Sequence, residues 1–140
     1  MSNLEKAIAV ATKAHAGQID KAGQPYILHP LRLMFKFEAE IEMIVAVMHD
    51  VIEDSAFTQD DLKKLGFSND VIEAIDCLSK RNGEDYNSFI LRVSKNELAK
   101  KVKIEDIKDN LNLTRLKIIT DKDLRRAEKY HRALALLTKQ

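Results

Sequence analysis

The sequence has 140 residues, 45% of them hydrophobic, so it suits one folded domain with a sizeable core and is not that of a disordered chain. Charged residues make up 32%, but 23 basic and 22 acidic side chains leave a net charge of only +1, which gives no indication of nucleic-acid or anionic-membrane binding. Four glycines and two prolines are too few for collagen, low-complexity linkers or most sandwich and barrel folds.

Apolar residues recur with helical spacing along almost the whole chain, and the strict alternation of a β-strand is absent. A loop with two glycines and a proline separates the first helix from the second, which begins near Pro30. We expect further helices at about 40–52, 69–79, 85–94, 96–116 and 121–138. The sequence therefore predicts a compact, multi-helix, all-α domain over residues 1–140.

Short polar residues and one glycine mark the ends of several of these helices. Thr58, Ser68 and Asp121 have side chains that cap helix N-termini, and Gly66 has the backbone freedom to end a helix. The first residues lack the charged and then apolar pattern of a signal peptide, and no apolar run reaches the ~20 residues of a membrane span. Cys77 is the only cysteine, which excludes an internal disulfide. We therefore expect a protein of the reducing cytoplasm.

Acidic residues gather in the middle of the chain. The segment 38–76 contains eleven of them, against only Lys63 and Lys64. Such a segment is either a set of solvated helix faces or a cation site surrounded by basic elements that receive an anion. Charge alone does not separate these two interpretations.

The most informative segment, residues 48–54, begins inside the helix expected at 40–52. On a wheel of about 100° per residue, His49, Asp50 and Glu53 fall on one side of this helix, and Asp54 lies next to them. The other side of the wheel is apolar and contains Val45, Met48, Val51 and Ile52. Grouping three carboxylates with an imidazole costs electrostatic energy unless a cation or water compensates for it.

An imidazole nitrogen combined with carboxylate oxygens is a ligand set for Mn, Fe or Zn. Because this segment contains no cysteine thiolate, such a mixed site favours Mn or Fe over a structural zinc. A divalent ion with open positions lowers the pKa of water, and Glu53 and Asp54 would then orient or deprotonate that water. The alternative is a helix C-terminus with solvated acids and one buried histidine, which is the favoured interpretation of an isolated His–Asp pair.

Two further segments add candidate ligands. His29 lies between a loop and a helix start next to Pro30, where a rigid backbone can aim its imidazole inward or leave it exposed. Asp106 and Asn110 are four residues apart and therefore neighbours on one helix face, with apolar residues on both sides. A partly buried Asp106 needs a partner, which is either a metal ion or a nearby lysine.

Taken together, these segments resemble the HD-domain metal-dependent phosphohydrolases, and more narrowly the hydrolase domain of RelA/SpoT homologues and the small alarmone hydrolases. The similar stretches occur in the family's order and cover most of the chain between residues 14 and 110. Each stretch alone is weak evidence, whereas the ordered set is specific. These stretches are residues 14–18, 21–30, 49–54 and 102–106, followed by Asn110.

The resemblance implies an all-α HD fold with one Mn²⁺ ion, with Fe²⁺ or Zn²⁺ as less favoured ions. In this fold, Glu53 and Asp54 match the acidic pair that positions and activates the attacking water. The residues that match the family's metal ligands are His29, His49, Asp50 and Asp106.

The resemblance also implies a small-molecule nucleotide substrate. Lys21 matches a basic residue near the nucleotide, and Asn110 matches a polar contact to its ribose or phosphate. The implied reaction removes the 3′-pyrophosphate of guanosine tetra- or pentaphosphate, the alarmones of the stringent response, and gives GDP or GTP and pyrophosphate. We expect hydrolysis without synthesis, because 140 residues leave no room for a synthetase domain.

Two departures from the family pattern concern the base of the nucleotide. Many members have an arginine just before the loop lysine, where this chain has Asp20, which cannot supply cation–π packing on guanine. The stretch 109–112 is more acidic than usual and lacks an arginine. Adenine-based alarmones such as ppApp, or another nucleotide with a 2′- or 3′-phosphate such as NADPH, are therefore alternative substrates. A non-catalytic nucleotide-binding module is the alternative from outside the enzyme class.

Overall fold

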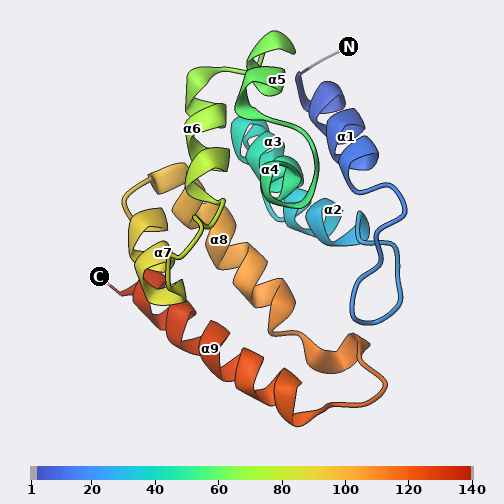
Figure 1. Ribbon diagram of the computed structural model, residues 1–140, viewed down its shortest axis with the longest axis vertical. Coiled ribbons are helices and arrows are strands. Elements are labelled where there is room, and N and C mark those ends of the chain that lie inside the picture. Colours follow the sequence, from blue (N-terminus) through green and yellow to red (C-terminus); the bar gives the residue numbers. More distant parts are fainter. Residues whose placement is uncertain (1–2, 140) are drawn as a thin grey trace.

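The computed structural model describes residues 3–139, and their regular structure is helical except for one isolated bridge between Ile19 and Pro25. This confirms the predicted all-α fold for the part of the chain that is described (Figure 1). The helices are α1 (Asn3–Ala14), α2 (Leu28–Met34), α3 (Glu40–Met48), α4 (Val51–Asp54), α5 (Gln59–Lys64), α6 (Asn69–Cys77), α7 (Tyr86–Val93), α8 (Glu97–Asn110), the 3₁₀ helix η1 (Leu113–Arg115) and α9 (Asp121–Thr138).

Helix α3 lies at the centre of the fold, where it contacts α1, α2, α6 and α8 (Figure 1). Its residues 44–48 are all buried. Five consecutive apolar side chains leave no polar face on this part of the helix, which is the pattern of a helix surrounded by other helices. The C-terminal end of α3, and the candidate residues that follow it, are therefore held inside the core.

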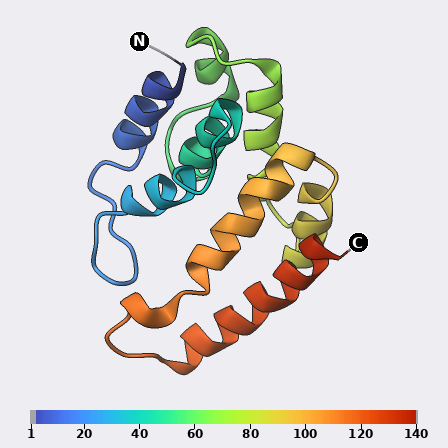
Figure 2. The ribbon, with the colours of Figure 1, turned by 180° about the vertical axis from the view of Figure 1, so that it is seen from behind.

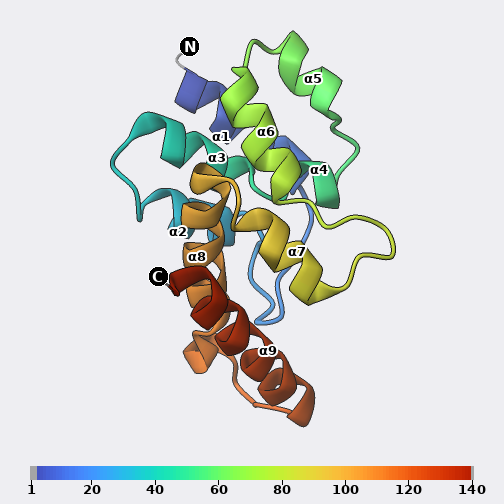
Figure 3. The same ribbon diagram turned by 90° about the vertical axis from the view of Figure 1, so that its left-hand side faces the viewer.

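Helices α8 and α9 pack against each other in opposite directions, and η1 lies in the connection between them (Figure 2). Seen from the side, α7 and α8 lie between α6 and α9 (Figure 3). The described helices include none with the combination of length and apolar character that crossing a membrane requires.

The predicted helix ends are mostly confirmed. Thr58 and Ser68 are N-caps whose side chains accept hydrogen bonds from backbone N–H groups of the first turn. Gly66 directly follows the last turn of α5 with a φ of 91°, a left-handed conformation that favours glycine. The prediction for Asp121 is wrong, because Thr120 caps α9 and forms a reciprocal capping box with Asp123.

Two predicted helices are too long. The helix expected at 40–52 ends at Met48, and a turn at His49 and Asp50 precedes the short helix α4. The grouping of candidate residues on one continuous helical wheel is therefore wrong. The helix expected at 96–116 ends at Asn110, because the side chain of Asn112 caps η1 and the guanidinium of Arg115 turns back to the backbone carbonyl of Asp109.

Candidate metal centre and the adjoining cavity

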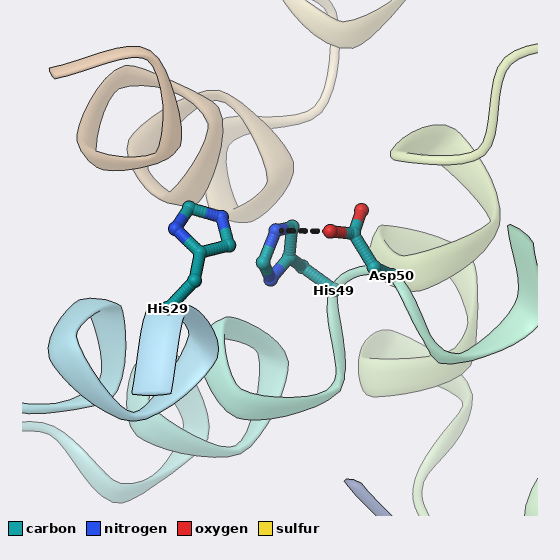
Figure 4. A group of neighbouring side chains, drawn as sticks. All are labelled: His29, His49 and Asp50. Carbon is teal, nitrogen blue, oxygen red and sulfur yellow. Dashed lines mark ion pairs between the residues drawn. The ribbon is translucent and has the colours of Figure 1, made fainter. Parts of the chain in front are cut away.

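Two buried histidines come together from different helices. His29 is the second residue of α2, and His49 directly follows the last residue of α3. The two residues are 5% and 1% exposed, and their ring centroids lie 5.2 Å apart. Figure 4 shows the two rings next to each other, with the Asp50 carboxylate directed at His49. The packing of α2 against α3 therefore brings together two residues that are predicted metal ligands.

Two carboxylates complete the cluster. One nitrogen or oxygen atom from each of His29, His49 and Asp50 lies within 4.8 Å of the other two. Oδ2 of Asp50 is 3.0 Å from Nε2 of His49. Oδ1 of Asp106, on α8, is 2.8 Å from Nε2 of His29 and 3.4 Å from Nε2 of His49. The structure thus gathers all four residues that sequence reasoning proposed as ligands, and their metal-binding role stays a prediction.

The hydrogen bonds of the two imidazoles direct their Nε2 atoms at this cluster. Nδ1 of His49 is 2.8 Å from the carbonyl oxygen of Ala46, which only accepts, so Nδ1 carries a proton and donates it. Nδ1 of His29 is 2.6 Å from a carboxylate oxygen of Asp109 and donates to it. In the neutral form of both histidines, the Nε2 lone pairs would therefore face the oxygens of Asp50 and Asp106.

This arrangement fits a divalent cation. Within the described residues, the buried Nε2 of His49 makes no hydrogen bond of suitable geometry, although carboxylate oxygens of Asp50 and Asp106 lie 3.0 and 3.4 Å away. Lone pairs that face carboxylate oxygens repel one another unless a proton or a cation lies between them. Ligand atoms at right angles around an ion, with bonds of about 2.1 Å, lie about 3 Å apart. The separations of 2.8, 3.0 and 3.4 Å agree with that spacing. Two nitrogens and two oxygens suit Mn, Fe or Zn.

Without a metal ion, protons provide the compensating positive charge. Burial alone would lower the pKa of His49, but the adjacent charges of Asp50 and Asp106 raise it well above its ordinary value. Burial likewise opposes protonation of His29, whereas hydrogen bonds to Asp106 and Asp109 raise its pKa.

The carboxylates respond in the opposite direction. Burial would raise the pKa of Asp50, but the charge of His49 lowers it to about 2. The pKa of Asp106 is held well below its ordinary value because the ammonium group of Lys103 and the charge of His49 outweigh its burial. The site therefore concentrates negative charge, and a bound cation would replace the protons that compensate for it.

The acidic pair lies in α4, directly after the turn that contains Asp50. Oε1 of Glu53 accepts a hydrogen bond of 3.1 Å from the backbone N–H of Lys80. Desolvation raises the pKa of Glu53, and the charge of Asp50 adds to this. The pKa of Asp54 is raised to about 6 by desolvation and by the charges of Asp50 and Glu53. Both side chains are thus within electrostatic reach of the histidine–carboxylate cluster, as proton acceptors near such a site would be.

Three further residues belong to the site: Tyr26 and Asp109, which were not singled out from the sequence, and Lys103, the nearby lysine expected as one alternative partner of Asp106. Tyr26 donates its hydroxyl hydrogen to Oδ2 of Asp50. Nζ of Lys103 is 2.8 Å from Oδ2 of Asp106. Asp109 accepts from His29. For Lys103 and Asp109 the sequence did contain a signal. Each lies three residues from Asp106, and residues with this spacing share a helix face.

A cavity of about 330 Å³ adjoins the cluster, with Tyr26 and His29 in its wall. It lies between the loop that follows α1 and the chain from the end of α8 into α9, which face each other in Figures 1 and 2. Lys21 and Asn110 both line this cavity, as expected for residues that contact one ligand. Asn110 also donates to Oδ1 of Asp106, at 3.2 Å, and thus links the cavity to the cluster.

Asp20 has a structural role in the loop that borders the cavity. Its Oδ1 accepts hydrogen bonds of 2.9 Å from the backbone N–H groups of Ala22 and Gln24. The backbone N–H of Asp20 donates to the carbonyl of Gln24, at 2.8 Å. The residue that replaces the usual arginine thus closes its own turn, a local hydrogen-bond pattern typical of aspartate.

Comparisons with known proteins agree with this geometry. No protein-family model matches the sequence. Over 81 residues, which are 55% of this chain, the sequence is 38% identical to the guanosine-3′,5′-bis(diphosphate) 3′-pyrophosphohydrolase of Vibrio cholerae. It is 36% identical over 84 residues to the bifunctional (p)ppGpp synthase/hydrolase SpoT of Escherichia coli K12. A third relative, the pyrophosphohydrolase of Aquifex aeolicus, is 29% identical over 121 residues, or 77% of this chain.

The chain spans only a small part of these relatives, since the matched segments make up 11%, 12% and 17% of their lengths. A solved structure of a metazoan SpoT orthologue that hydrolyses ppGpp superposes with a TM-score of 0.81. The superposition covers 99% of this chain and 86% of the other, at 19% identity, which shows a shared fold. The resemblance to HD-domain hydrolases of the RelA/SpoT type is therefore confirmed in sequence and in fold.

Proposed function

We propose that this chain forms one hydrolase domain that removes the 3′-pyrophosphate of guanosine-3′,5′-bis(diphosphate), with Mn²⁺ as its cofactor. The observation that carries the proposal is the convergence of His29, His49, Asp50 and Asp106 within ligand-to-ligand distances, beside a cavity. The names of the sequence relatives support the choice of substrate.

The reaction breaks the bond between the ribose 3′ oxygen and the adjacent phosphorus. The oxygen of a water molecule bonds to that phosphorus, a proton is delivered to the ribose oxygen, and GDP and pyrophosphate leave. When bound, a divalent ion lowers the pKa of water and stabilises the charge that develops on the phosphoryl oxygens.

Within this scheme, Glu53 orients the attacking water molecule and Asp54 accepts a proton from it. In the metal-free protein, desolvation and the neighbouring carboxylates raise the pKa of Asp54, which is the direction that favours a general base. The backbone N–H of Lys80 restrains one oxygen of Glu53 and leaves the other carboxylate oxygen for a water molecule. Lys21 and Asn110 contact the nucleotide from the cavity wall.

The choice of Mn²⁺ rests on ligand chemistry. Two imidazole nitrogens and two carboxylate oxygens suit Mn²⁺ and Fe²⁺, and the cluster contains no thiolate of the kind that structural zinc sites use. We expect Mn²⁺ to give the highest turnover in a series that includes Fe²⁺, Zn²⁺ and Mg²⁺. Higher turnover with any of the other ions would contradict this choice.

The base is the least constrained part of the substrate. Asp20 is engaged in its own turn, so this loop position offers no arginine to pack on guanine, and the arginines of the cavity wall come from other elements. The cavity wall still offers Lys21, Asn110 and other polar groups for hydrogen bonds to a base. This makes ppApp and NADPH the alternative substrates to include in any assay.

Product analysis by anion-exchange chromatography tests the proposal. The purified chain is incubated with Mn²⁺ and, separately, with ppGpp, pppGpp, ppApp, NADPH and simple 2′- and 3′-nucleotides. Release of pyrophosphate and GDP from ppGpp supports the proposal. Turnover of another nucleotide alone would replace ppGpp by that substrate. If protein shown to contain metal converts none of them, the proposal is wrong, and the chain either hydrolyses another substrate or is a nucleotide-binding module.

A further inference from the structure

Asp109 lies behind His29, on the side that faces away from the other three predicted ligands. Its Oδ2 is 2.6 Å from Nδ1 of His29, while Nε2 of the same ring is 2.8 Å from Oδ1 of Asp106. Asp106 and Asp109 are one turn apart on α8, so the imidazole from α2 lies between two carboxylates of one helix face. The Asp109 side chain is only 10% exposed, so it is not a solvated surface acid.

Two arginines restrain the Asp109 carboxylate. Arg32, one turn after His29 on α2, donates to both carboxylate oxygens at 3.0 and 2.9 Å. Arg115 donates at 2.8 Å to the backbone carbonyl of Asp109 and approaches Oδ2 at 3.4 Å. Because such a paired carboxylate stays charged and only accepts, it requires a proton on Nδ1 of His29.

We propose that Asp109 is a positioning residue that holds the proton on Nδ1 of His29, so that the Nε2 lone pair is available to a metal ion. Arg32 and Arg115 fix the carboxylate in this role. The inference rests on the metal centre of the proposed function but is independent of which nucleotide is hydrolysed. Carboxylates that accept the second N–H of a metal-binding histidine set its tautomer and ring orientation and raise its basicity.

The substitution Asp109→Asn separates this role from that of a simple tether between α2 and α8. The side chain keeps its size, but the oxygen that accepts from His29 is also the one that faces Nη2 of Arg32 and of Arg115. If the amide NH₂ group takes this place, Nδ1 of His29 has to accept and the ring proton moves to Nε2, where it blocks the lone pair. If the amide oxygen takes this place, Nδ1 keeps its proton, but its acceptor is uncharged and the imidazole is less basic. Both orientations lower metal affinity, whereas a tether of similar size between the helices would leave it unchanged.

Two measurements on the metal-free full chain test the proposal. Titration calorimetry with Mn²⁺ and with Zn²⁺ gives the metal affinity, for which we expect a loss of about 10–100-fold in Asp109→Asn. Long-range ¹⁵N–¹H spectra of the Zn²⁺-loaded and metal-free protein show which ring nitrogen of His29 carries the proton. The matched control is Asp70→Asn, an exposed acid in the first turn of α6, for which we expect less than about a twofold change.

Wild-type affinity together with an unchanged His29 tautomer in folded Asp109→Asn would overturn the proposal. If that variant does not fold, Arg115→Gln, which removes one of the two arginines, is measured instead. We expect a smaller, several-fold loss of affinity in it, and wild-type affinity there would count against the proposal. A chain whose metal affinity depends on Asp109 but which hydrolyses no nucleotide would disprove the proposed function alone.

Discussion

Nε2 of His49 and Oδ2 of Asp50 lie 3.0 Å apart, although consecutive residues of a helix point about 100° away from each other. The short distance arises because the chain leaves the helix at this point. Asp50 has φ and ψ of −104° and 2°, which places it between α3 and α4. The turn directs two predicted ligands to one place and aims the following carboxylates, Glu53 and Asp54, from a separate short helix.

This separation predicts different consequences for Asp50→Ala and Glu53→Ala. The first removes a predicted metal ligand, so we expect metal binding and hydrolysis to be lost together. The second leaves the ligands in place, so we expect unchanged metal affinity and a loss of turnover of roughly 100-fold or more. Metal content by mass spectrometry and steady-state turnover check both, with the exposed Glu73→Ala as control. Turnover by a metal-free Asp50→Ala protein would contradict the assignment.

Lys103 gives a second prediction because its ammonium group is 2.8 Å from Oδ2 of Asp106 and only 13% of its side chain is exposed. In the metal-free protein, Lys103→Met leaves Asp106 with less compensation, and we expect a loss of about 3 kcal/mol in the free energy of unfolding. Saturating Mn²⁺ should recover part of this loss, since a bound cation neutralises the same carboxylate.

Urea denaturation with and without Mn²⁺ measures these effects. The control is Lys101→Met, which removes the ion pair between Lys101 and Glu42. The side chain of Lys101 is 58% exposed. We expect less than about 1 kcal/mol for it, with or without the metal. If Mn²⁺ stabilised the wild type and Lys103→Met equally, Lys103 and the metal ion would not be neutralising the same charge.

The sequence correctly predicted the all-α fold and singled out four residues that the structure brings together, but it did not predict their geometry. The apolar pattern continues from Val45 through Ile52, so helical periodicity gives no sign of the turn at His49. Spacing along one helix places residues on a face only where that helix is continuous. The packing of α2, α3 and α8 decides the rest.

Asp109 and Asp20 show why the remaining contacts could not be predicted. In the sequence, both residues are acidic departures from a family pattern. In the structure, Asp109 bonds to a histidine 80 residues away, whereas Asp20 bonds to backbone groups two and four residues away. A residue type does not by itself distinguish a long-range contact from a local turn.

A third prediction concerns the loop that restrains Glu53. Arg92 joins the two ends of this loop, since its guanidinium donates to the carbonyl of Ser79 at 2.8 Å and to Glu84 at 3.0 Å. The backbone N–H of Lys80, within the loop, donates to Glu53. Glu84→Gln weakens the charged contact, so we expect faster hydrogen exchange at the Lys80 amide and reduced turnover, with unchanged metal affinity. Glu73→Gln is the control.

The pH dependence of Glu84→Gln provides an independent check. The hydrogen bond from Arg92, together with one from the backbone of Arg81, lowers the pKa of Glu84 from 4.5 to about 2. A carboxylate with a lowered pKa stabilises the folded state above its unfolded pKa and loses this effect as the pH falls through its folded pKa. The stability difference from the wild type should therefore be full at pH 7 and shrink towards pH 2. A difference that stayed constant over this range would assign the effect to packing instead.

The contribution of Asp54 to stability has the opposite pH dependence. Desolvation, together with the charges of Asp50 and Glu53, raises its pKa from 3.8 to about 6. A carboxylate with a raised pKa favours the folded state fully below its unfolded pKa, and this contribution is lost as the pH rises through the folded value. We therefore expect metal-free Asp54→Asn to be more stable than the wild type at pH 7.5, with a difference that disappears near pH 4. Urea denaturation at both values, with the exposed Glu38→Gln as control, measures it. Equal stability of Asp54→Asn and the wild type at pH 7.5 would mean that Asp54 is ionised without cost and is not tuned towards accepting a proton.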